Sequence, residues 1–161
     1  MKPLFVLLGA FLLALGATRL FGGSLNFLLA GNVALAVMLL FTGAAHFALT
    51  NGMVLMLPEW LPGRKAWVYF TGVVELAAAM GLLVPALRPL VGWLLIAFFV
   101  LVLPGNIYAA MHHINYQKAT TDGPGPRYLW FRIPLQLLFI AWTWYFSVHL
   151  PATLPFASLS Y

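Results

Sequence analysis

Apolar residues form five long runs along the chain, and most charged residues lie in the short segments between them. A helix needs roughly 20 mainly apolar residues to cross the hydrocarbon core of a membrane. The last four runs reach that length, and the first is shorter. The runs cover residues 3–17, 26–49, 66–84, 89–111 and 129–150. The pattern therefore predicts an all-α fold, a transmembrane helical bundle of four or five helices.

The first run has two interpretations. Lys2, a short apolar stretch and the small residues at 14–16 resemble a secretory signal peptide with its cleavage site. The same residues also suit a retained N-terminal hydrophobic helix over residues 1–22. We expect this segment to be retained as a helix. The alternative is that residues 1–17 are removed in the cell as a signal peptide.

The composition indicates that lipid is the solvent for most of the chain. Hydrophobic residues make up 63% of the 161 residues and charged residues 7%, whereas a soluble domain carries roughly a quarter charged residues. The length suits a single membrane domain, residues 1–161. The chain has no cysteine, which excludes a disulfide framework, an iron–sulfur cluster, a cysteine-rich zinc site and thiol redox chemistry.

The basic residues indicate orientation and not nucleic-acid binding. The net charge is +5, but the eight Lys and Arg residues are scattered at the ends of the apolar runs. One side of the predicted bundle holds Lys2, Arg64, Lys65, Lys118 and Arg127, and the other holds Arg19 and Arg88. Cytoplasmic loops are enriched in Lys and Arg. We therefore expect an integral protein of a bacterial-type cytoplasmic (inner) membrane, with a cytoplasmic N-terminus.

The connecting segments contain residues that break helices. Residues 50–65 hold two prolines, which rule out one long helix, and Trp60, which suits a segment at the membrane interface. Residues 85–89 begin and end with proline and predict a tight turn between antiparallel helices. Residues 112–127 form the longest polar stretch and are expected to form a loop.

Five polar residues stand out inside the predicted spans, where a charge costs roughly 2.5–3.5 kcal/mol and therefore needs a reason. They are His46, Glu75, Asn106, Arg132 and Gln136. Helical spacing gives each helix one polar stripe, and a rise of ~1.5 Å per residue places all of these residues in the cytoplasmic half. We expect them to line one connected ligand-binding pocket that opens towards the loop around Trp60.

These residues also have structural interpretations. Glu75 and Arg132 could form a buried ion pair that fixes helix registry, and we expect their side chains within direct or one-water reach. A protonated Glu75, or an Arg132 that extends to the headgroups, are the alternatives. His46 is more often a packing residue than a metal ligand, and Asn106 could satisfy carbonyls freed by Pro104. We expect no metal and no other cofactor.

Several short motifs follow one another between residues 26 and 150. They are Gly43-Ala44-Ala45-His46-Phe47, Leu57-Pro58, Leu61-Pro62, Thr71-Gly72-Val73-Val74-Glu75-Leu76, Gly81-Leu82-Leu83-Val84-Pro85, Pro104-Gly105-Asn106-Ile107-Tyr108 and Arg132-Ile133-Pro134-Leu135-Gln136. Their order and spacing resemble the DoxX-like family of small integral membrane proteins, which is named after a subunit linked to quinone-dependent thiosulfate oxidation. The resemblance implies a four-helix core over residues 26–150, with the five polar residues as its polar centre. The extra N-terminal segment and the lack of cysteine depart from the family, and the chain offers no redox group of its own.

Three functions are compatible with these features. The first is binding of a lipophilic small molecule, quinone- or sterol-like, whose polar head the pocket holds. The second is an accessory or assembly subunit of a membrane oxidoreductase complex, with another membrane protein as its partner and a purely structural polar core. The third is a membrane-embedded enzyme in which Glu75 and His46 act as acid and base. A transporter is less attractive, because five spans without a repeat offer little for alternating access unless the chain forms a homo-oligomer.

Overall fold

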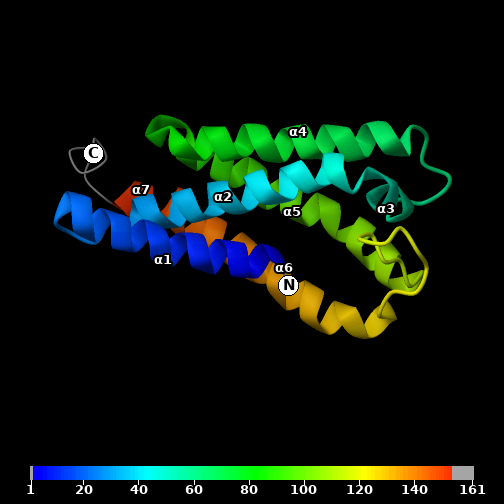
Figure 1. Cartoon of the computed structure of the whole chain (residues 1–161). Helices are drawn as coiled ribbons and strands as arrows, with labels where there is room; N and C mark the ends of the chain where they lie inside the picture. Colours follow the sequence, from blue (N-terminus) through cyan, green and yellow to red (C-terminus); the bar gives the residue numbers. More distant parts are fainter. Residues whose placement is uncertain (1, 154–161) are drawn as a thin grey trace.

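The computed structural model describes residues 2–153, and the regular elements of this part are all helices (Figure 1). The long helices are α1 (Lys2–Gly22), α2 (Phe27–Ala48), α4 (Arg64–Leu83), α5 (Arg88–Met111) and α6 (Leu129–Thr143). The shorter elements are α3 (Thr50–Leu55), the 3-10 turns η1 (Pro85–Leu87) and η2 (Gly125–Tyr128), the π-helix η3 (Trp144–His149) and α7 (Leu150–Thr153).

Five helical segments of the described chain are long and apolar enough to cross a membrane. The first extends to Gly22, beyond the apolar run that ends at residue 17, and so reaches spanning length. In the last segment α6, η3 and α7 follow one another without a break, from Leu129 to Thr153. The all-helical class is therefore confirmed, and all five predicted segments form helices long and apolar enough to span a membrane.

Local sequence explains where several helices begin. The Oδ1 atom of Asn26, just before α2, accepts a hydrogen bond from the N–H of Leu29 at 2.9 Å, which satisfies a donor that the helix start leaves free. Gly63 precedes α4 with a φ of +66°, a conformation that costs glycine little because it has no Cβ atom. Pro85 and Pro89 lie in the first turns of η1 and α5, where the missing N–H breaks no helical bond. The turn between α4 and α5 makes them the predicted antiparallel hairpin (Figure 1).

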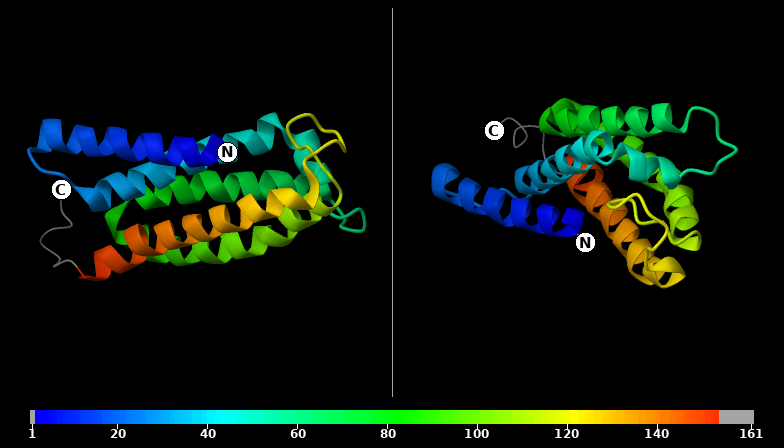
Figure 2. Two further views of the ribbon diagram at one scale, coloured as in Figure 1. Left: turned by 90° about the horizontal axis from the view of Figure 1, so that it is seen from below. Right: turned by 45° about the vertical axis from the view of Figure 1, so that its right-hand side comes forward.

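Helix α2 is the central element of the bundle. It packs against α1 and α4, and it also contacts η3, while α5 packs against α6 and η3 (Figures 1 and 2). The buried core between these helices consists mainly of leucine, alanine and phenylalanine side chains, for example Leu35, Leu39, Leu82, Leu95 and Phe139.

The outer surface is apolar as well. Leu13, Phe21 and Trp130 are 77%, 91% and 87% exposed, and many other large apolar side chains face outwards. A water-facing surface would carry charged groups at these positions, so the distribution suits a lipid environment.

Helix α1 lies on the side of the bundle. It packs on α2 and buries Leu7 completely. The ring of Phe11 lies 5.0 Å from the ring of Trp142 and 5.6 Å from that of Phe146. The rest of α1 is largely exposed, so this helix adds one layer to the bundle without entering its centre.

The bundle splays at the end that carries α3 and residues 112–128. Helix α4 and the start of α6 diverge there, and α3 and the loop lie between them (Figures 1 and 2). Gly52 of α3 faces the backbone carbonyl of Tyr116, and a Cβ atom at Gly52 would clash with that carbonyl. The short α3 occupies the part of the segment 50–65 that precedes Pro58. We refer to this region below as the splayed end.

Candidate functional site

Glu75 lies on the inward face of α4. The buried residues of this helix are Val68, Gly72, Glu75, Ala79 and Leu82. Steps of four and three residues place them on one face, and α2 is the main neighbour of α4. The Glu75 side chain is therefore held between two helices, and the residue is only 8% exposed.

His46 of α2 is the side chain that faces the Glu75 carboxyl group. Its Nδ1 atom lies 3.9 Å from Oε2 of Glu75, which is too far for a hydrogen bond. The same Nδ1 atom lies 2.9 Å from the carbonyl oxygen of Thr42, which can only accept, so Nδ1 donates to its own helix. Gly72 permits this close approach, because a Cβ atom there would lie 2.7 Å from the Cβ atom of His46.

The Glu75 carboxyl group lacks a partner for one of its oxygens. Oε2 is buried and has no hydrogen bond with any of residues 2–153. The hydroxyl of Thr42 lies beside the carboxyl group, but it donates to the carbonyls of Met38 and Leu39 at 3.2 and 3.3 Å. Buried polar atoms are normally hydrogen-bonded, and an exception calls for a functional or solvent explanation. Glu75 can therefore accept a hydrogen bond from a group outside the chain.

Arg132 of α6 binds Asn106 of α5 and not Glu75. Its Nη2 atom donates to Oδ1 of Asn106 at 3.0 Å, and Nδ2 of Asn106 donates to the carbonyl of Val102 at 3.2 Å. Glu75 and Arg132 form no direct ion pair, so that form of the expected contact is wrong, and a contact through one water stays a prediction. Helix α6 packs beside α5, so an acceptor on α5 lies nearer than a carboxylate that α4 directs at α2. Arg132 attracts Glu75 through space only.

Gln136 has a third, separate partner. It is 4% exposed, and its Nε2 atom donates to the carbonyl of Phe99 in α5 at 2.7 Å. Pro104 lacks the N–H that would bond to the carbonyl of Val100. Gln136 thus reinforces α5 next to the point where the helix loses a backbone bond. Asn106 bonds to Val102, so it does not replace the bond lost at Val100.

A small cavity of about 30 Å³ adjoins Asn106 and Arg132. Met56, Ile114 and Tyr116, from the end of α3 and the loop, cover it. This volume is about that of one water molecule. Trp60, around which we expected the opening, is 80% exposed and does not line the cavity.

The five residues thus gather in three contacts at neighbouring helix interfaces. His46 faces Glu75 between α2 and α4, while Asn106 with Arg132, and Gln136 with the Phe99 carbonyl, join α5 to α6. Their assignment as ligand-binding residues stays a prediction.

Sequence reasoning missed two features of the polar interior. Thr42 lies beside Glu75, and its position four residues before His46 on the same helical face is the signal that could have revealed it. Asn32 belongs to a different cluster, in which it accepts from Oγ of Ser147 at 2.8 Å and donates to the carbonyl of Phe146 at 2.8 Å. Two polar residues of α2, Asn32 and His46, therefore lie at two different helix interfaces.

Comparison with known proteins gives one match. No curated protein and no solved structure matches the chain. A family model described as a domain of unknown function (DUF8561) matches residues 35–147, which is more than half of the chain. The matched region runs from within α2 to within η3, so it includes all five predicted site residues and leaves α1 outside. The chain belongs to the DUF8561 family.

Proposed function

We propose that the protein is a small integral membrane protein that binds the polar head of a lipophilic small molecule, quinone- or sterol-like, at the Glu75 cluster. The observation that carries the proposal is the buried Oε2 atom of Glu75, which has no hydrogen-bond partner. An unsatisfied buried acceptor costs about 1–3 kcal/mol. A hydroxyl group on a ligand would satisfy it, and the apolar surroundings suit a lipophilic body.

The neighbouring groups would orient such a head. The largely buried His46 ring lies 3.9 Å from the carboxyl group. The guanidinium of Arg132 is held by Asn106 at the edge of the small cavity, and it can donate to a carbonyl or hydroxyl oxygen with its remaining N–H groups. Glu75 does not line this cavity, so a head that contacts both groups must extend from the cavity towards α4.

Access would be through the splayed end. The cavity of about 30 Å³ holds one water and not a ring. Met56, Ile114 and Tyr116 lie over it, on segments that also form the contact between Gly52 and the Tyr116 carbonyl. A movement of α3 away from residues 112–128 would enlarge the cavity, so we propose that these two segments act as a lid.

We also propose a cellular membrane for the protein and an orientation within it. The splayed end carries Arg64, Lys65, Lys118 and Arg127, whereas Arg19 and Arg88 lie at the opposite end. This bias supports a bacterial-type inner membrane with the splayed end and the N-terminus in the cytoplasm. The resemblance to the DoxX-like proteins supports the same setting. A reporter that is active only in the cytoplasm, fused after Arg127 or after Arg88, tests the orientation: we expect activity from the first fusion only.

Extraction of the purified protein tests the binding function. We expect organic solvent to release a lipophilic molecule from the native protein, and Glu75→Gln to retain several-fold less of it. Glu59→Gln makes the same chemical change at an exposed position and should retain as much as the native protein. A long-chain quinone and a sterol, added separately to the delipidated protein, then identify the class. Equal retention by both variants, or no retention by the native protein, would contradict the proposal.

The second candidate function is an accessory or assembly subunit of a membrane complex. In two of the three polar contacts, both partners are hydrogen-bonded inside the protein. These are the contacts of Arg132 with Asn106 and of Gln136 with the Phe99 carbonyl. A purely structural polar centre would look like this and would need no larger cavity. Cross-linking in native membranes discriminates the two: a single membrane partner joined to the protein, with no retained small molecule, would favour the accessory function.

A further inference from the structure

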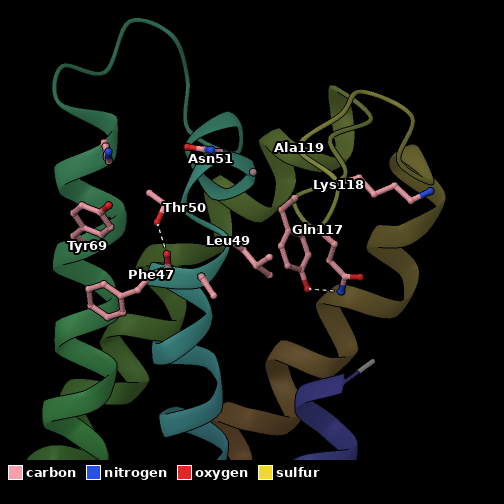
Figure 3. A pocket seen from close by; sticks show the side chains of 12 residues that line it. Phe47, Leu49, Thr50, Asn51, Tyr69, Gln117, Lys118 and Ala119 are labelled. Atoms are coloured by element: carbon pink, nitrogen blue, oxygen red, sulfur yellow. Dashed lines mark hydrogen bonds between the residues drawn. The ribbon is translucent and has the colours of Figure 1, made fainter.

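A larger hollow lies at the splayed end, outside the Glu75 cluster. Its volume is about 390 Å³, within the range of roughly 300–1,000 Å³ that is typical of small-molecule sites. It lies between the end of α2, the start of α3, the first turns of α4 and the turn at residues 116–119 (Figure 3). We call it the interfacial groove.

One wall of the interfacial groove is aromatic and carries a positive charge. The rings of Phe47 and Tyr69 are stacked, with centroids 5.6 Å apart and an angle of 12° between their planes (Figure 3). The Nζ atom of Lys65 lies 5.7 Å from the centre of the Tyr69 ring. A cation over an aromatic face is held in place without losing its capacity to donate.

The remaining lining mixes polar residues such as Thr50 and Asn51 with apolar ones such as Leu49, and no acidic residue of the described chain belongs to it. The side chain of Asn51 supplies an amide group at its rim (Figure 3). The amide of Gln117 lies on the other side of α2 from Phe47 and Tyr69, and its Nε2 atom donates to the hydroxyl of Tyr116 at 3.4 Å (Figure 3). Lys118 also belongs to the lining, but Figure 3 shows its side chain directed away from the groove. Lys65 is therefore the positively charged side chain that a ligand in the groove would meet.

We propose that the interfacial groove binds the phosphate headgroup of an anionic membrane lipid. The ammonium group of Lys65 and the amide of Asn51 suit a phosphate, which is an anion with several acceptor oxygens. No carboxylate lies in the groove to oppose it.

The surroundings favour a lipid over a free phosphate. Phe47 and Tyr69 are partly exposed, and the neighbouring Trp67 and Phe70 are 48% and 58% exposed on the same helix as Tyr69. In a membrane this apolar surface lies against acyl chains, so a headgroup in the groove would have its tails beside it. The connecting segments at this end also carry more basic than acidic residues, namely Arg64, Lys65, Lys118 and Arg127 against Glu59 and Asp122. A positively charged end attracts an anionic leaflet.

Lipid binding to the full-length protein in detergent tests the proposal. Native mass spectrometry would compare phosphatidylglycerol with phosphatidylcholine of the same acyl chains, for the native protein and for Lys65→Gln, Lys65→Arg and Arg127→Gln. We expect the native protein to prefer phosphatidylglycerol and Lys65→Gln to bind it about tenfold more weakly, since one charge-assisted contact is lost. Lys65→Arg should keep the affinity.

Arg127→Gln is the matched control. It removes one positive charge from the same end at an exposed residue outside the groove, and it should leave the affinity unchanged. An equal loss in both charge-removing variants would show that only the overall charge of this end attracts the lipid, and would overturn the proposal. Equal binding of phosphatidylcholine would do the same. Inorganic phosphate should not displace the lipid at matched ionic strength, and full displacement would show a free-anion site instead.

Discussion

Arg132 and Asn106 form a hydrogen bond across the interface between α5 and α6, from Nη2 to Oδ1 over 3.0 Å. This bond gives the guanidinium a neutral acceptor inside the bundle and joins the first turn of α6 to α5 just beyond Pro104. It also leaves the Glu75 carboxyl group without a direct bond to any Lys or Arg of the described residues. The nearest ring is that of His46, whose Nδ1 atom lies 3.9 Å away and donates to the Thr42 carbonyl. The predicted site residues thus form two satisfied contacts between α5 and α6 and an unsatisfied one between α2 and α4.

The bond between Asn106 and Arg132 predicts a coupling energy. Asn106→Ala leaves the guanidinium without its acceptor, and Arg132→Gln removes the donor. We expect a coupling of about 0.6 kcal/mol, the average for polar contacts between membrane helices, and at most about 1.7 kcal/mol. Reversible unfolding of the two single variants and the double variant in mixed micelles measures it. The parallel cycle of Glu75→Gln with Arg132→Gln should give a smaller value, because these side chains interact through space only. A larger coupling in the second cycle would contradict the observed pairing.

Glu75 and Gln136 should respond in opposite ways to an apolar substitution. Glu75→Leu removes a buried acceptor that has no partner, so thermal stability in detergent should stay equal or rise while ligand retention is lost. Gln136→Leu leaves the Phe99 carbonyl without its donor and should cost about 1 kcal/mol. The midpoint temperatures of thermal unfolding of the two variants test this prediction. If Glu75→Leu were the more destabilising of the two, Glu75 would be a structural residue and the accessory function would gain support.

Replacement by alanine should affect stability differently at Gly72 and at Gly105. A Cβ atom at Gly72 would lie 2.7 Å from the Cβ atom of His46, whereas one at Gly105 would meet nothing nearer than 3.8 Å. We expect Gly72→Ala to separate α2 from α4 and to cost about 1–3 kcal/mol. Gly105→Ala should be neutral or stabilise α5 by up to about 1 kcal/mol, since alanine favours the helix. Denaturant titration of both variants tests this, and an equal effect would be the contrary result.

The contact between Gly52 and the Tyr116 carbonyl predicts how the lid opens. Gly52→Ala places a methyl group against a backbone atom, so α3 and the loop must move apart. We expect faster hydrogen exchange over residues 112–128, with the rest of the bundle unchanged. Gly9→Ala in α1, where a Cβ atom would meet nothing within 4 Å, is the control. Unchanged exchange in Gly52→Ala would argue against a lid that depends on this contact.

The loop contains a carboxyl group whose titration is predictable. The hydroxyl of Thr120 donates to Asp122, and mainly for this reason the pKa of Asp122 lies below its usual value, with a smaller contribution from Lys118. A lowered pKa in the folded state stabilises the loop above the usual pKa, and this contribution is lost as the pH falls through the lowered value. Thr120→Val should raise the pKa of Asp122 towards about 3.9, and Lys118→Gln should raise it less. Carboxyl NMR titration measures both, and an unchanged pKa in Thr120→Val would refute this account.

Most of the fold was predictable because membrane helices depend on local properties. Apolar run length, the two prolines in residues 50–65 and the proline-bounded turn at 85–89 predicted the spans and the hairpin. The first helix continued past its apolar run because its polar residues find acceptors in the same segment. Oγ1 of Thr18 donates to the carbonyl of Leu15 at 2.9 Å, and Arg19 donates to the carbonyl of Gly23 at 2.6 Å.

The depth of the candidate site residues in the membrane was predictable, but their hydrogen-bond partners were not. Counting residues placed His46, Glu75, Asn106 and Arg132 towards the same end of the bundle, because the rise per residue of a helix is fixed. The partner of each side chain depends on which helix lies beside which and on how each is rotated. Helix α6 packs on α5, and Gly72 brings α4 against α2 at His46. These two helix contacts depend on how all the helices pack together, so only the tertiary structure decided them.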